Sequence, residues 1–515
     1  MNIAEAKEQI RGALKAYLTK DEFGCYKIPT EKQRPVFLIG PPGIGKTAVM
    51  RQIASELGVG LISYSMTHHT RQSALGLPYI VEKEYGGKTY QVSEYTMSEI
   101  IGSVYDLMRD TGITEGILFL DEINCISETL APCMLQFLQF KIFGQHRLPE
   151  GWIVVTAGNP PEYNKSVRDF DIVTWDRLKR IDVEPDYEVW KDYAYRNGVH
   201  PAVMTYLYAK TDDFYRVQST VDGKTFVTAR SWEDLSEMIK LYEENGLVVN
   251  DRLVCQYLQD PKIARDFAIY YDLYHKYRSD YKIDAILDGT VSEDIVARAS
   301  TAKIDERFSL LGIIFGAVTT KMRGICDTED MLARLVRLVR QIGPEIADGA
   351  PAAELLEKYC GEMREEIAKG RASSSLSPEK QKETRRVAAQ LELYREKILK
   401  KNAGEDDFTI IRETYDDTLF SLRSEVEEAQ RILQNTFDFC EKAFSDGDEM
   451  LILVTELTAN YYCARFIGHY GCEKYYTYNR ELQFEERKKS ITDRIARLEQ
   501  LDLDGFDREG RYGQR

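Results

Sequence analysis

Gly40-Pro41-Pro42-Gly43-Ile44-Gly45-Lys46-Thr47 is the stretch around which the chain is organised. It matches the P-loop pattern G-x-x-x-x-G-K-[ST], which requires a strand before the loop and a helix after it. Residues 35–39 form a short apolar run that predicts a buried parallel strand. Residues 48–57, closed by Gly58, predict a helix. Both flanks agree with the pattern, so we expect an α/β domain of the P-loop class.

The composition of this loop suits a chain of phosphates. Its glycines let the backbone approach a ligand closely, and the free N–H groups and dipole of the following helix favour an anion there. Lys46 adds a positive charge for the β- and γ-phosphates, and Thr47 offers a hydroxyl to Mg²⁺. We therefore expect ATP and Mg²⁺ as cofactors, and we assign nucleotide binding to Gly40, Pro41, Pro42, Gly43, Ile44, Gly45, Lys46, Thr47 and Ala48.

Composition limits the classes of protein to consider. At 515 residues the chain should hold two to four domains, and its 43% hydrophobic and 30% charged residues are ordinary for a globular protein. No apolar run approaches the roughly 18 residues that span a bilayer, and the first residues lack a signal-peptide core, so we expect a cytoplasmic protein without a membrane span. The nine cysteines form no C-x-x-C pair, which favours reduced thiols. A net charge of −16 argues against a protein that coats nucleic acid, although a local basic pore remains compatible with it.

A second motif follows the P-loop at residues 116–122. Four apolar residues precede Asp121 and Glu122, which predicts a buried strand with carboxylates at its C-terminal end, the Walker B pattern. Asp121 would hold Mg²⁺, and Glu122 would orient or deprotonate the attacking water. Such an acid pair is weak alone and becomes strong downstream of an intact P-loop. Between the two motifs, alternating runs on either side of Gly86-Gly87 predict a β-hairpin inserted at about residues 66–97.

Three further polar residues each have a functional and a structural interpretation. Asn159 ends an apolar strand at residues 152–158, where it could hold the water or sense the γ-phosphate, or simply form a turn before Pro160. Arg177 and Arg180 follow a helix, where the helix dipole explains a cation, but either could also act on a neighbouring subunit's phosphate as an arginine finger.

The order of these motifs resembles the MoxR-type AAA+ ATPases, a clade with a hairpin insert near helix 2. The resemblance covers roughly residues 30–275. It implies a parallel five-stranded core of strand order 5-1-4-3-2 and a helical lid. It also implies Asn159 as sensor 1 and Arg177 as the finger, with Arg180 as the second candidate. Arg230 resembles the family's sensor 2 arginine, although relatives often have proline where this chain has Ala229; the alternative is a surface arginine beside an N-cap at Ser231.

The same resemblance implies a homo-oligomer, a hexameric ring, with a chaperone-like role. The client would be a protein, often one with a von Willebrand factor A-type domain. Two alternatives stay open. One is a nucleic-acid-directed motor, which the predicted hairpin disfavours because its lysines Lys83 and Lys88 are balanced by Glu82 and Glu84. The other is a nucleotide-gated assembly scaffold with little turnover.

The C-terminal half carries no catalytic motif that we recognise. Apolar residues at three- and four-residue spacings among dense charges predict an all-α region. We expect helices at about residues 304–342, 379–401, 408–445 and 484–501, with a flexible tail at 502–515. The predicted domains are an N-terminal helix and lead-in at 1–34, the α/β core at 35–185, the lid at 186–275 and a helical accessory domain at 276–515 with an exposed linker near 369–378.

Overall fold

The computed structural model describes residues 1–164, 166–167, 170–220, 223–373, 375–400, 406–445 and 447–480. The helix predicted at 484–501 and the tail at 502–515 lie outside the described residues.

The N-terminal part is built on one parallel sheet. Its strands are β1 (Val36–Ile39), β2 (Gly60–Ser65), β5 (Gly116–Asp121), β8 (Trp152–Gly158) and β9 (Lys179–Asp182). They lie in the order β2-β5-β8-β1-β9, and every pairing is parallel. Counted along the chain from the other edge, this is 5-1-4-3-2, so the predicted strand order is confirmed.

Helices cover both faces of this sheet, which explains its nearly continuous apolar strands. On one face, α1 (Ile3–Tyr17) and α2 (Lys46–Leu57) bury Leu14 and Ile53 against Leu38. On the other face, α4 (Glu99–Thr111) and α5 (Ala131–Phe140) pack against Phe37 and Leu118. The smaller elements of this region are η1 (Thr30–Lys32), η2 (Met66–His68), α3 (Arg71–Leu75), η3 (Ile123–Cys125) and α6 (Ile172–Trp175).

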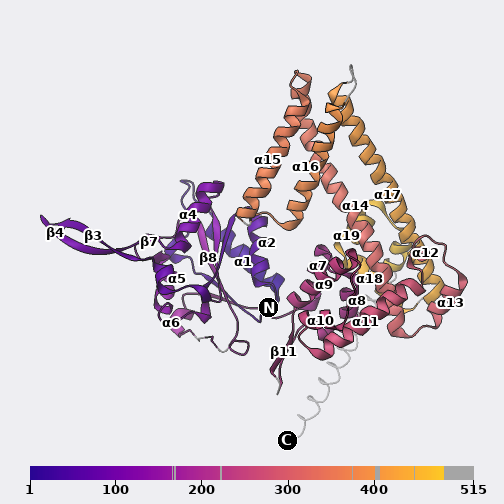
Figure 1. The fold of residues 1–515 in the computed structure, drawn as a ribbon, viewed down its shortest axis with the longest axis horizontal. Helices are drawn as coiled ribbons and strands as arrows, with labels where there is room; N and C mark the ends of the chain where they lie inside the picture. Colours follow the sequence, from indigo (N-terminus) through magenta and orange to yellow (C-terminus); the bar gives the residue numbers. More distant parts are fainter. Residues whose placement is uncertain are drawn as a thin grey trace, which may run out of the picture.

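Two hairpins extend from this core. The predicted insertion forms β3 (Pro78–Tyr85) and β4 (Lys88–Tyr95), which project as a ribbon into solvent (Figure 1). Gly86 and Gly87 have φ of 59° and 77°, the positive values that a two-residue turn requires. The second hairpin consists of β6 (Ile142–Phe143) and β7 (His146–Arg147).

The described part of the lid region contains five helices. It also contains one hairpin, which the sequence analysis did not predict. The helices are α7 (Tyr187–Asn197), α8 (Pro201–Ala209), α9 (Ala229–Glu244), α10 (Asp251–Tyr257) and α11 (Pro261–Asp280), with η4 (Thr211–Asp213). The hairpin pairs β10 (Arg216–Thr220) with β11 (Gly223–Val227). The Asp222-Gly223 pair in the sequence is a hairpin-turn signal that could have predicted it.

Over the described residues the rest of the chain is built of helices, which confirms the all-α region. They include α12 (Ile283–Leu287), α13 (Glu293–Thr301), α14 (Ile304–Ala347), α15 (Ala352–Ala372), α16 (Pro378–Leu399), α17 (Asp407–Phe444), α18 (Asp448–Ala459) and α19 (Tyr461–Tyr470). One hydrophobic core runs through both the lid and the accessory helices, from Tyr187 to Tyr475, whereas the α/β core has its own two clusters. The lid and the accessory helices therefore form one packed body.

The long helix α14 is apolar for much of its length. Within the described residues, its segment Glu306–Ile346 passes a length and composition test for a membrane span, with a mean hydropathy of 1.3 in the most apolar window. The sequence analysis expected no such run. Of that window, 56% is buried inside the structure, as in the central helix of a packed bundle, and one helix of this kind is weak support for a span.

The sequence analysis expected an exposed linker or a long loop near 369–378. This segment is the tip of a hairpin formed by α15 and α16, and it docks on the α/β core (Figure 1). The Leu61 N–H donates to the carbonyl of Ser373 at 2.9 Å, and the Ser377 N–H donates to Oγ of Ser55 at 3.1 Å. Because Leu61 lies on the edge strand β2, the tip satisfies a backbone group that the sheet leaves unpaired.

Candidate functional site

The P-loop connects β1 to α2 through a backbone that only glycine tolerates. Gly43 and Gly45 have φ of 75° and 91°. A Cβ atom on Gly43 would also lie 2.5 Å from Oγ1 of Thr228, at the start of α9. The loop therefore packs against the lid so closely that a side chain at Gly43 cannot be accommodated.

The side chain of Lys46 is buried beneath this loop. Its Nζ atom donates to the carbonyls of Gly40 at 2.7 Å and Pro41 at 2.9 Å, and to Oδ1 of Asn159 at 2.9 Å. Burial lowers the pKa of Lys46 to about 8, against the opposing charge of Asp121. The bond to Asn159 brings the loop together with the end of β8.

Thr47 and Asp121 meet at the carboxyl end of β5. The Thr47 hydroxyl donates to Oδ2 of Asp121 at 3.2 Å. Both are hard oxygen donors of the kind that Mg²⁺ prefers. Within the described residues no group of three or more His, Cys, Asp or Glu side chains could hold a metal alone. A site with so few protein ligands fits Mg²⁺, which is usually held by one or two side chains together with phosphate oxygens and water.

Glu122 is held in a strained conformation next to this pair. Its φ of 56° lies in the left-handed region, which is costly for a residue with a side chain and persists where the surroundings impose it. Its Oε2 atom accepts hydrogen bonds from Ser65 Oγ at 3.0 Å and from Thr67 Oγ1 at 3.1 Å. The sequence analysis missed both hydroxyl residues. They follow from the sheet order, because β2 ends beside β5.

Asn159 is tied to a second residue that the sequence analysis missed. Asn124 donates through Nδ2 to the carbonyl of Asn159 at 2.8 Å. Its side chain packs on Gly158, where a Cβ atom would lie 2.4 Å from Asn124 Oδ1. These contacts fix the end of β8, while the Asn159 side chain accepts the hydrogen bond from Lys46.

Arg230 lies at the N-terminus of α9, against the P-loop. Its N–H donates to the carbonyl of Gly43 at 3.2 Å, and its charge contributes to the lowered pKa of Lys46. The N-cap of this helix is Thr228, in a capping box with Ser231, so the predicted cap at Ser231 is wrong by three residues. The structure thus places the backbone of Arg230 against the loop, while its side chain is exposed and its role as a sensor stays a prediction.

Arg177 and Arg180 differ in how they are held. Both side chains are exposed. Arg180 pairs with Asp182 at 2.8 Å and lies over the Trp175 ring, 4.9 Å from its centroid. Among the described residues, no hydrogen bond or ion pair engages the side chain of Arg177. Neither arginine is brought to the P-loop of its own chain by any such contact in this part of the structure.

A cavity of about 920 Å³ opens beside the loop. Its walls come from α1, the P-loop and α2 on one side and from the lid on the other, with Arg230 and Trp190 among the lid residues. The accessory helices complete it through Arg323, Arg386 and neighbouring side chains. The volume is that of a small-molecule site, and we call this space the nucleotide cleft.

Comparison with known proteins agrees with this geometry. Residues 36–171 match the family described as "ATPase family associated with various cellular activities (AAA)". A Lon protease of Leptospira interrogans is 24% identical over 255 residues, which are 45% of this chain and 28% of that protein. The chain thus spans little more than a quarter of the length of the curated relative it matches. The matched stretch contains Lys46, Asp121, Glu122 and Asn159, so the site described above lies within the part of the chain that is similar to AAA ATPases.

Proposed function

We propose that the protein is a MoxR-like AAA+ ATPase that hydrolyses ATP with Mg²⁺ at the interfaces of a ring and uses the energy to remodel a partner protein. The observation that carries the proposal is the convergence of Lys46, Thr47–Asp121, Glu122 and Asn159 at one end of the sheet. The MoxR-type motif order supports the finer assignment, including a hexamer and a client with a von Willebrand factor A-type domain. The Lon match supports ATP hydrolysis alone, because it covers only 28% of that protease.

The residues divide the reaction among them. Lys46 neutralises charge on the β- and γ-phosphates, and Asn159 holds its ammonium. When bound through Thr47 and Asp121, Mg²⁺ would neutralise charge between the same phosphates. Glu122 accepts a proton from the attacking water, and Ser65 and Thr67 fix its carboxylate in place.

The ring is proposed because, among the described residues, neither Arg177 nor Arg180 makes a hydrogen bond or ion pair that would bring it to the P-loop of its own chain. An arginine finger supplied by a neighbour stabilises the charge that develops on the γ-phosphate. Arg177 is exposed and has no ion-pair partner among the described residues, whereas Arg180 is engaged by Asp182. We therefore assign the finger to Arg177. Arg180 serves as the matched control.

The test combines mass photometry with a phosphate-release assay. Wild-type protein, Arg177→Ala and Arg180→Ala are compared with and without Mg·ATP. We expect an assembly near six subunits, turnover reduced about 1,000-fold or more in Arg177→Ala, and a small effect in Arg180→Ala. A monomer whose turnover is the same in wild type and Arg177→Ala contradicts the proposed ring. An assembled ring with negligible turnover favours the scaffold function, and turnover stimulated by DNA favours a nucleic-acid motor.

A further inference from the structure

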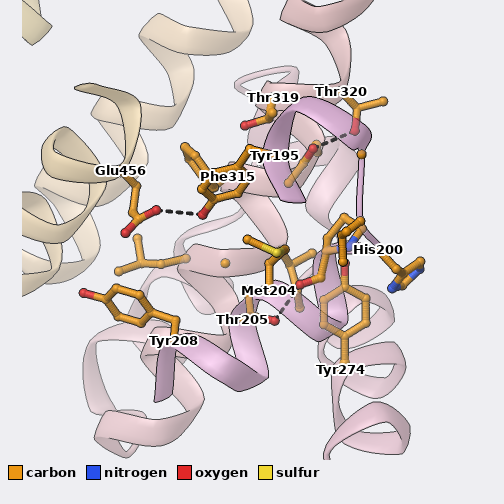
Figure 2. Close-up of a pocket in the computed structure, with 18 of the residues that line it drawn as sticks. Tyr195, His200, Met204, Thr205, Tyr208, Tyr274, Phe315, Thr319, Thr320 and Glu456 are labelled. Carbon is orange, nitrogen blue, oxygen red and sulfur yellow. Dashed lines mark hydrogen bonds between the residues drawn. The ribbon is translucent and has the colours of Figure 1, made fainter. Parts of the chain in front are cut away.

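A second cavity, of about 680 Å³, lies between the lid and the accessory helices (Figure 2). Its walls are formed by α7, α8, α9 and α11 on the lid side and by α12, α14 and α18 on the accessory side. No P-loop residue lines it, whereas Gly43, Gly45 and Thr47 line the nucleotide cleft. Its volume lies within the range of sites that bind small molecules.

Apolar side chains dominate the walls. Met204 and Tyr208 of α8 face Tyr195 and Phe315 across the space shown in Figure 2. Leu311 and Leu453 add to the same surface. Burial of an apolar group against such walls is favourable by roughly 25 cal/mol for each Å² removed from water. A ligand of this cavity should therefore be largely apolar.

The carboxylate of Glu456 is already neutralised. It accepts from Lys191 Nζ at 2.5 Å through Oε1 and from the Tyr195 hydroxyl at 2.7 Å through Oε2. The Lys191 and Glu456 side chains are 8% and 9% exposed, so the pair is buried together. Glu456 therefore has little negative charge to offer a ligand.

Glu243 is satisfied in the same way. His200 Nδ1 accepts from the Ala202 N–H, so its Nε2 carries the proton that faces Glu243 at 3.1 Å. Tyr271 donates to the other oxygen at 2.8 Å, and His275 lies 3.2 Å from it. Burial alone would raise the pKa of Glu243, but the hydrogen bonds from His200 and His275 lower it well below its usual range. Both oxygens of the Glu243 carboxylate therefore already have hydrogen-bond partners within the protein.

The cations of the walls are less fully paired. The Nε atom of Arg323 is buried and has no hydrogen-bond partner in the part of the chain that the structure describes. Arg278 has no carboxylate partner among the described residues, whereas Lys240 pairs with Glu237. The remaining carboxylate, Asp284, is exposed to solvent. Arg323 is half-buried, lines the cavity and has no carboxylate partner among the described residues, so its guanidinium favours an anionic group there.

We propose that this cavity binds an amphipathic carboxylate, an apolar chain or ring with one acidic head, whose head group pairs with Arg323. The chain of the ligand occupies the space between α8 and α14. The proposal assigns a second ligand site to the protein, separate from the nucleotide cleft.

Arg323 also connects the two sites. Arg323 and Asn197 line both the second cavity and the nucleotide cleft. The Arg323 guanidinium lies over the Tyr462 ring, 5.4 Å from its centroid, and a Cβ atom on Gly198 would be 1.9 Å from its Nη1. The side chain is thus closely confined, and a carboxylate that pairs with it alters the wall of the cleft. This coupling rests on the proposed nucleotide binding, whereas the binding of the acid does not.

The binding test uses decanoate as the probe and 1-decanol as its uncharged match, titrated by calorimetry into full-length protein without nucleotide. We expect one decanoate per chain and at least tenfold weaker binding of the alcohol. Arg323→Gln should weaken decanoate about tenfold and leave the alcohol unchanged. Arg364→Gln, at a side chain that is 71% exposed on α15, is the control.

Cavity-filling variants locate the probe. Met204→Trp and Ile452→Trp fill the space from opposite walls, and thermal unfolding identifies any variant that fails to fold. Loss of decanoate binding in either folded variant supports the site. Unchanged binding in both, or equal affinity for acid and alcohol, overturns the proposal. A shift in the affinity of a fluorescent ATP analogue at saturating decanoate supports the coupling, and an unchanged affinity overturns the coupling alone.

Discussion

The Nζ atom of Lys46 lies 2.9 Å from Oδ1 of Asn159, and this contact joins the P-loop to the end of β8. Two polar residues 113 positions apart are thus joined by one hydrogen bond, which Lys46 donates, at the point where the γ-phosphate is expected. The ammonium therefore has a fixed direction before any ligand arrives. Preorganised charge of this kind costs no reorganisation when the reaction occurs.

Replacing Lys46 with alanine should abolish tight ATP binding, because the only buried cation under the described part of the loop is lost. The affinity of a fluorescent ATP analogue checks this, and Lys15→Ala, at an exposed position on α1, is the control. Near-normal affinity in Lys46→Ala contradicts the P-loop assignment.

Glu122→Gln should bind ATP normally and hydrolyse it about 100-fold or more slowly, because the amide keeps the shape of the side chain but cannot take a proton. Phosphate release under saturating ATP measures the loss. Ser65→Ala combined with Thr67→Val should lower turnover less, since the Glu122 side chain is still present but loses its two hydroxyl contacts. Unchanged turnover in Glu122→Gln removes this residue from its role.

ATP affinity should fall as pH rises above about 8. The pKa of Lys46 is lowered to about 8 by burial, so the free protein loses this charge above that pH. Bound phosphates favour the ammonium, so binding takes up a proton there and weakens by at most about tenfold per pH unit. Below pH 8 the ammonium is already present and affinity should change little. Titrations from pH 7 to 9.5 in a Glu122→Gln background measure the slope, which should be absent in Lys46→Met.

Gly312→Ala should destabilise the protein by about 1–3 kcal/mol through overpacking. A Cβ atom at this position would lie 1.8 Å from Cγ2 of Thr205, where α14 crosses α8. Gly324→Ala on the same helix is the matched control, because nothing lies within 4 Å of its Cβ position. The control should be neutral or stabilising by about 0.5–1 kcal/mol. Urea unfolding of both variants measures their free energies of unfolding. Equal values for the two variants contradict the close packing of α14 on the lid.

The sequence predicted those parts of the fold that depend on residues close together in the chain. The P-loop and the Asp121-Glu122 pair each lie at a strand end, and the order of such motifs carries the resemblance that implied the parallel sheet. The hydroxyls of Ser65 and Thr67 and the amide of Asn124 have no motif of their own. They enter the site because neighbouring strands end side by side, which becomes visible only when the strand order is known.

The docked tip shows the opposite case. Small polar residues around Ser373 are typical of a loop, and local composition gave no sign of burial. The contact between Ser377 and Ser55 spans 322 residues, so no window along the chain contains both partners. Ser373 is nonetheless fully buried. Local composition indicates only which conformation and exposure a segment favours by itself. Here contacts with the α/β core bury Ser373 instead.

This tip also bears on how the lid and accessory helices are held to the α/β core. The polypeptide passes from the core to the lid between β9 and α7, and the α15–α16 tip provides a further attachment to the core at β2. The lid itself contacts the P-loop, where the Arg230 N–H donates to the carbonyl of Gly43 and the Tyr215 hydroxyl donates to the carbonyl of Pro42. Because the lid and the accessory helices share one hydrophobic core, separating the lid from the P-loop without also breaking the tip contacts would require that shared core to deform.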